Sequence, residues 1–73
     1  MSKRLNAAIS SGKVTVRPRV AGEVALTFKN PSVKNIILRA GEDTELTKHV
    51  PASLLMQSNL SSLISRRLVR IVG

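Results

Sequence analysis

The chain has 73 residues and a net charge of +8, with no cysteine, one histidine and one aromatic residue. The length predicts a single domain, and the 42% hydrophobic content predicts that it folds. The lack of cysteine excludes disulfides, and the single histidine argues against a histidine or thiolate metal site, so we expect no metal and no cofactor.

The first segment, residues 1–12, is small, polar and basic. It contains one possible helical stripe, but a helix this short is marginal in isolation. The stripe consists of Leu5, Ala8 and Ile9. We expect a flexible N-terminal arm, mobile alone and ordered against a partner through Lys3 and Arg4; a frayed terminus is the alternative. Residues 13–73 are expected to form the single small domain.

Two stretches with alternating apolar residues, 13–20 and 23–29, predict half-buried strands. Pro18 lacks a backbone donor, so the first strand ends there or lies at an edge. The inward side chains are expected to be Val14, Val16, Val24, Leu26 and Phe28. The turn signal Ala21–Gly22 between the two stretches favours a β-hairpin.

Residues 34–40 predict a third strand, in which Ile36, Ile37 and Leu38 are consecutive. Because strict alternation is lost, both faces of this strand should be covered, by a second layer or by another subunit. These three residues are therefore candidates for binding a partner. The loop 41–50 that follows holds the only acidic patch, whose spacing does not match a helix–loop–helix calcium site, and we expect a solvated loop.

Residues 51–68 form the predicted helical part. Apolar residues at i, i+4, i+7 and i+8 lie on one face, and they are Met56, Leu60, Leu63 and Ile64. The polar stretch 57–59, with Ser58 as a helix N-cap, predicts two short helical turns or one kinked helix ending near Arg66. Residues 68–72 then alternate as a last strand with Arg70 on its outer side. The predicted fold class is α+β.

The positive charge is concentrated at the two ends. Residues 1–22 hold five cations and no acid, and residues 46–73 hold four cations and no acid. This distribution predicts an acidic partner surface, either nucleic acid or protein, with solubility as the alternative explanation. The candidate cations for partner binding are Lys3, Arg4, Arg17, Arg19, Arg66, Arg67 and Arg70. A structural explanation also fits Arg66 and Arg67, because cations near a helix C-terminus stabilise the macrodipole.

Catalytic motifs are missing from the sequence. There is no nucleophile–base pair in a motif context and no glycine-rich phosphate loop, so we expect no enzyme activity. Nucleic-acid binding is possible but less favoured, since single-strand binders stack bases on aromatic side chains and this chain has one. No apolar stretch approaches the roughly 20 residues of a membrane helix, and we expect no membrane partner.

The stretch KNIILRAGEDTELTKHVPASLLMQSNLSSLISRRLVRIVG, residues 34–73, resembles small virion proteins of tailed bacteriophages, similar to those of Mu-like phages. The likeness lies in a strand, a polar loop, a proline-started helix of the form P-x-x-L-L-x-x-S-x-L-x-x-L and a terminal strand; residues 1–33 match no part of it. It implies a non-enzymatic head or tail component.

From this resemblance we expect a minor capsid protein, of the cement or decoration type, that binds and stabilises the head shell. Its partners would be the major capsid protein or other virion subunits. A chain of this length buries only about 60% of its unfolded surface, so we also expect a homo-oligomer. The protein would be made in the host cytoplasm and located in the virion. The alternatives are a small basic nucleic-acid-binding module or, within the virion class, a head-completion or tail component.

Overall fold

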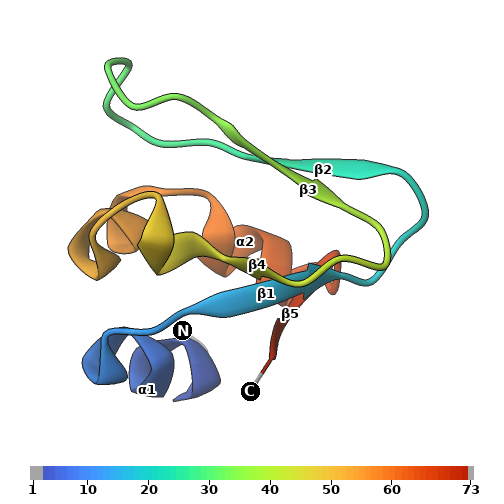
Figure 1. The fold of residues 1–73 in the computed structure, drawn as a ribbon, viewed down its shortest axis with the longest axis horizontal. Coiled ribbons are helices and arrows are strands. Elements are labelled where there is room, and N and C mark those ends of the chain that lie inside the picture. The colour runs from blue at the N-terminus through green and yellow to red at the C-terminus, as the bar shows by residue number, and fades with distance from the viewer. Residues whose placement is uncertain (1–2, 73) are drawn as a thin grey trace.

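The computed structural model describes residues 3–72, which form short helices and antiparallel strands and confirm the predicted α+β class (Figure 1). Two of the helical segments, η1 and η2, are 3₁₀-helices. In chain order the elements are α1 (Lys3–Ser11), β1 (Thr15–Pro18), β2 (Glu23–Leu26), β3 (Ile36–Arg39), β4 (Thr44–Glu45), η1 (Leu46–Lys48), η2 (Ala52–Gln57), α2 (Leu60–Ser65) and β5 (Val69–Val72).

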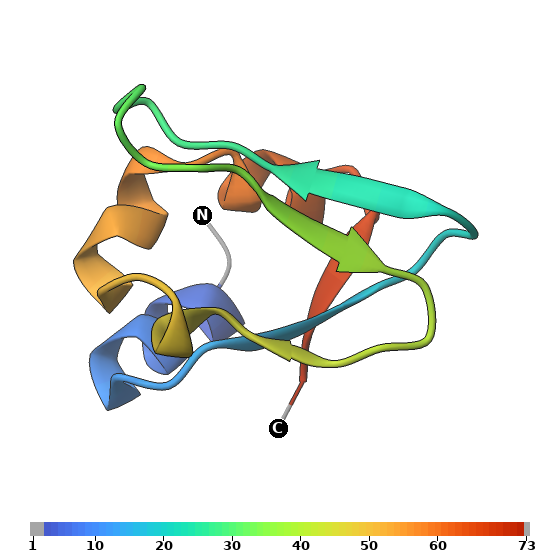
Figure 2. The ribbon, with the colours of Figure 1, turned by 45° about the horizontal axis from the view of Figure 1, so that its top comes forward.

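The strands form two sheets. β1 is the central strand of an antiparallel sheet with the order β4-β1-β5, and β2 pairs only with β3. The resulting β2–β3 hairpin lies on the opposite side of β1 from α1 (Figures 1 and 2). The predicted hairpin between the first two strands is therefore wrong. Alternation fixes which face of a strand is buried, but it does not fix which strand lies beside it.

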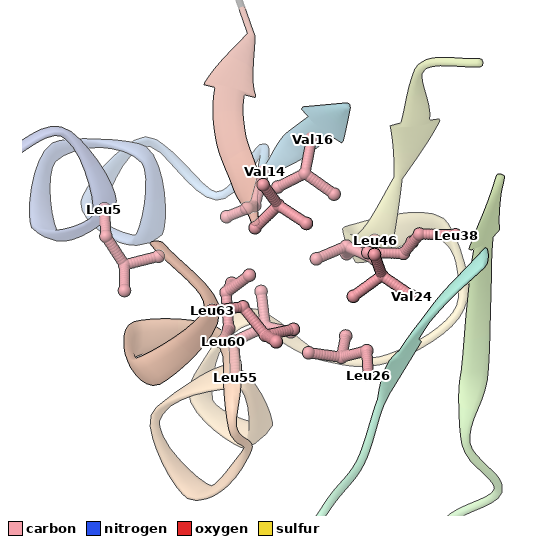
Figure 3. Packing of buried hydrophobic residues seen from close by; sticks show 11 residues of the cluster. Leu5, Val14, Val16, Val24, Leu26, Leu38, Leu46, Leu55, Leu60 and Leu63 are labelled. Atoms are coloured by element: carbon pink, nitrogen blue, oxygen red, sulfur yellow. The ribbon is translucent and has the colours of Figure 1, made fainter. Parts of the chain in front are cut away.

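The core is built from leucine and valine side chains that come from nearly every element (Figure 3). No polar or charged residue is buried within residues 3–72. Pro18 is also buried. The buried leucine and valine side chains are those of Leu5, Val14, Val16, Val24, Leu26, Leu38, Leu46, Leu55, Leu60, Leu63 and Val69. Among the strand residues, Val16, Val24 and Leu26 are inward positions that alternation predicts, whereas Leu38 comes from the stretch in which alternation is lost. Phe28 is an exception, because it is only half-buried at the edge of the core.

The N-terminal segment is part of the folded domain where the structure describes it. Residues 3–11 form α1, and Leu5 is only 2% exposed, with Ala8 and Ile9 packed against the core. The helical stripe is thus the packing face of α1, which replaces the flexible arm predicted for this segment. The physical reason is that tertiary contacts stabilise an amphipathic helix that is too short to be stable alone. Residues 1 and 2 of the predicted arm lie outside the described part of the chain.

The structure decides between the two alternatives predicted for the helical region: it has two short segments, η2 and α2, rather than one kinked helix, and α2 ends next to Arg66 as expected. η2 and α2 are separated at Ser58, whose hydroxyl donates to the carbonyl oxygen of Leu55 at 2.6 Å and accepts from the Leu60 N–H at 3.2 Å. This break changes the helical register. Met56 is therefore 59% exposed rather than on the buried face, and Leu55 is buried instead.

The third strand is covered on one face only. Leu38 is fully buried and Ile36 is half-buried, whereas Ile37 is 47% exposed. Leu38 therefore belongs to the core rather than to a partner surface. The second covered face that the sequence predicts is not supplied by residues 3–72, so Ile37 is the residue of the three that is left to contact another chain.

Candidate functional site

An open groove lies between α1 and the β1–β5 part of the three-stranded sheet. Its volume is about 870 Å³. The groove is lined by Arg4, Ala7, Ala8, Ser11, Lys13, Thr15, Arg70, Ile71 and Val72. We call this hollow the basic groove, because its charged side chains are all cations.

The helix wall of the basic groove follows from helical spacing. Arg4, Ala8 and Ser11 lie at i, i+4 and i+7, so they share one face of α1. Alanine and serine side chains are short, and their size leaves the groove open between the helix and the sheet. Leu5 belongs to the buried stripe and anchors the helix to the core.

The sheet wall follows from the register of β1 and β5. Thr15 pairs with Val72 and Arg17 pairs with Arg70, so these four side chains point to the outer face of the sheet. Val16 points the other way, into the core. The outer face therefore presents two cations, Arg17 and Arg70, next to the apolar residue Val72.

The charges in the basic groove are not neutralised by neighbouring carboxylates. Arg4, Lys13 and Arg70 are exposed, and the lining contains no acidic residue. Within residues 3–72 the ion pairs are those of Arg17 with Asp43 and Arg39 with Glu23, so these three cations have no ionic partner in the described chain. An anion that enters the groove meets three cations.

Arg17 lies next to the groove but is held by other groups. Its Nε is 2.8 Å from Oδ1 of Asp43, and its Nη2 donates to the carbonyl oxygen of Gly41 at 3.2 Å. The Asp43 contact is an ion pair rather than a hydrogen bond, because the Nε–H finds no acceptor in hydrogen-bond geometry. Like charges directly opposite in a sheet repel, and Asp43 offsets this repulsion between Arg17 and Arg70. Arg17 therefore contributes little free charge to the groove.

Of the predicted partner-binding cations, Arg4 and Arg70 line the basic groove, although they come from opposite ends of the chain. Arg17 lies opposite Arg70 in the sheet but does not line the groove. Lys3 and Arg19 are exposed outside the groove. Ile36 and Ile37 lie on the β2–β3 hairpin and do not line it.

Arg66 and Arg67 also lie outside the basic groove. Arg66 is the C-cap of α2, and Arg67 follows it. This position fits the structural explanation by the helix macrodipole, which requires no ligand.

Sequence reasoning missed small residues that shape the groove, above all Ala7, Ser11 and Thr15. Helical spacing gave part of the signal, because Ala7 and Ser11 lie on the face of α1 next to the stripe of Leu5, Ala8 and Ile9. Which element that face would meet depends on the position of β5, and the sequence pattern does not show it.

Two other features, a metal site and a membrane-spanning helix, were sought within the described residues. No group of three histidine, cysteine, aspartate or glutamate side chains within residues 3–72 is arranged to hold a metal ion. None of the helices in the same range has the length and apolar character needed to cross a membrane. Comparison with protein-family models, with curated proteins and with solved structures gave no match to this chain.

Proposed function

We propose that this protein is a non-enzymatic structural component of a tailed-bacteriophage virion, a minor capsid protein of the cement or decoration type that binds and stabilises the head shell. The resemblance of residues 34–73 to small virion proteins supports the class. The observation that carries the binding function is the basic groove, where Arg4, Lys13 and Arg70 are exposed without ionic partners. A shell presents the same acidic site many times, so a small protein that is itself oligomeric gains avidity by binding repeatedly.

Exposed apolar side chains support association between copies of the chain. Ile37 is 47% exposed on β3, opposite Ala25 of β2 on the same outer face of the hairpin. Val20 and Met56 are also exposed. These residues are candidates for contacts within a homo-oligomer or with the major capsid protein, while the cations orient the protein and raise its rate of association.

The second candidate function is nucleic-acid binding, which the three unpaired cations of the groove also support. Against it, no aromatic residue lines the groove, and Phe28 is half-buried beside a different, smaller hollow. A binder of this kind attracts phosphates without stacking bases. Its affinity for duplex DNA would fall with salt, with a log–log slope near −0.9 for each phosphate contact.

The test compares two partners at near-physiological salt. The purified protein is mixed with assembled phage heads and co-sedimented, and in parallel its affinity for random duplex and single-stranded DNA is measured. We expect retention on heads that saturates at a fixed number of copies, and only weak binding to DNA. Tight DNA binding with a large salt slope and no retention on heads would show that the nucleic-acid function is the correct one.

A further inference from the structure

We propose that the basic groove binds an extended acidic segment of a partner protein, which adds as a strand to the free edge of β5. The inference rests on the proposed function for the class of partner and specifies how that partner is held. It follows from three features of the groove: an unpaired strand edge, three cations and a strip of small apolar side chains.

The strand edge is given by the order β4-β1-β5, which leaves β5 with a neighbour on one side only. The Arg19 N–H donates to the carbonyl oxygen of Leu68 at 2.7 Å, so the backbone of Leu68 faces β1. Backbone groups alternate along an antiparallel strand, and those of Arg70 and Val72 therefore also face β1. The N–H and C=O of Ile71 then point away from β1. Ile71 is also one of the residues that line the groove.

An unpaired strand edge is a template for another extended chain, and strand addition is a common way to bind peptides. No hydrogen bond within residues 3–72 engages the outward backbone groups of Ile71. An added strand would pair with these groups while lying between β5 and α1. Ala7 and Ala8 are small enough to let a backbone pass close to the helix.

Charge selects the occupant of the groove. Arg70 favours carboxylates on the outer face of the sheet, with Arg4 and Lys13 also lining the groove, whereas Ile71 offers an apolar side chain on the opposite face of β5. A strand has acidic residues on one face and aliphatic residues on the other when the two kinds alternate, and such a segment matches the two faces of β5. A second copy of this chain fits poorly, because its net charge is +8 and its own β5 carries Arg70. Nucleic acid would leave the apolar side chain and the backbone groups of Ile71 unused.

The probe is a blocked heptapeptide in which glutamate and valine alternate, compared with the same peptide carrying glutamine in place of glutamate. Binding is followed by NMR on the labelled full-length protein. We expect saturable binding of the acidic peptide, at least about tenfold weaker binding of the glutamine peptide, and slower hydrogen exchange of the Ile71 amide in the complex. Binding that leaves the Ile71 amide unprotected would overturn the strand addition.

The charge-reversal variant Arg70→Glu tests the groove within the protein. The new carboxylate lies opposite Arg17, so we expect the variant to stay folded. Its affinity for the acidic peptide should fall by about tenfold. Lys34→Glu is the matched control, since it makes the same change of charge at an exposed residue between β2 and β3 that does not line the groove. This control should change the affinity for the peptide by less than about twofold. Equal losses in both variants would show that only net charge matters, and the groove proposal would then be wrong.

The same variants separate this inference from the proposed function. If heads retain the wild-type and Arg70→Glu proteins equally, the groove inference is wrong and the virion function stands. If heads retain neither protein while the acidic peptide binds as described, the virion function is wrong and the groove inference stands. A 20-base-pair DNA duplex is also tested as a competitor of the peptide at near-physiological salt. If the duplex displaces the peptide and binds more tightly, the groove is a nucleic-acid site and the proposal is wrong.

Discussion

Arg67 adopts a left-handed backbone conformation, with a φ of 59°, immediately after the C-cap of α2. The Arg67 N–H donates to the carbonyl oxygen of Ile64 at 3.0 Å, and the Leu68 N–H donates to that of Leu63 at 2.9 Å. These two bonds form a Schellman motif, whose left-handed position is usually occupied by glycine. A side chain with a Cβ costs roughly 1–2 kcal/mol in this conformation. Arg67 is therefore a site of local strain on the surface.

We predict that Arg67→Gly has a free energy of unfolding equal to or higher than that of the wild type. The relief of strain offsets the roughly 0.5–1 kcal/mol lost to the greater freedom of glycine in the unfolded chain. Arg66→Gly is the control: Arg66 has a φ of −85°, so that change brings the entropic loss without relief and should destabilise by about 0.5–1 kcal/mol. Urea denaturation of the three proteins gives the comparison. Equal destabilisation by both glycines would contradict the prediction.

At the scale of elements, the side chain of Asn59 links the end of β2 to the start of α2. Oδ1 of Asn59 accepts from the Thr27 N–H at 2.9 Å, and its Nδ2 donates to the carbonyl oxygen of Ala25 at 3.3 Å. The backbone of Asn59 adds a bond from its N–H to the carbonyl oxygen of Thr27 at 3.0 Å. Asn59 therefore replaces a neighbouring strand at the end of β2 and holds the two-stranded sheet, which is marginal by itself, against the helical layer.

We predict that Asn59→Ala lowers the free energy of unfolding by about 1–3 kcal/mol, because the partly buried Thr27 N–H loses its acceptor. The control is Asn30→Ala. Asn30 accepts from the Ser32 N–H at 2.9 Å with the same chemistry, but in an exposed turn where water can replace it, so the loss should stay within about 0.5 kcal/mol. Thermal or urea denaturation measures both values. A loss for Asn59→Ala no larger than for Asn30→Ala would show that the hairpin does not depend on this contact.

At the scale of the whole molecule, α1 completes the core rather than extending from it. Leu5 is 2% exposed and lies across the core from the hairpin, with the leucines of η2 and α2 nearby (Figure 3). The domain is small and purely aliphatic inside, so each large side chain provides a considerable share of the apolar surface that folding buries.

We predict that Leu5→Ala destabilises the domain by about 2–5 kcal/mol, as expected for a large-to-small change in a core. The stability of small domains is of order 5–15 kcal/mol, so the melting temperature should fall markedly. Asn6→Ala, on an exposed position of the same helix, should change the free energy of unfolding by no more than about 0.5 kcal/mol. If Leu5→Ala melts like the wild type, α1 acts as a separate arm after all.

The sequence by itself determined the local features whose signal lies within a few residues. Alternation identified the inward side chains Val14 and Val16, and Pro18 ended the first strand where it removes a donor. Ser58 marked the break between two helical segments, and Arg70 took its predicted outward position on β5. In each case the cause is short-range, since side-chain direction and capping depend on neighbours in the chain.

Only the tertiary structure decided which elements meet. β1 lies between β4 and β5, partners that begin 26 and 51 residues after its last residue, because burying the aliphatic faces of every element in one core outweighed the nearby turn at Gly22. The same packing turned the predicted arm into α1. It also produced the basic groove, in which Arg4 and Arg70, from opposite ends of the chain, share one surface. Long-range packing brings these two residues together, and no local sequence pattern encodes it.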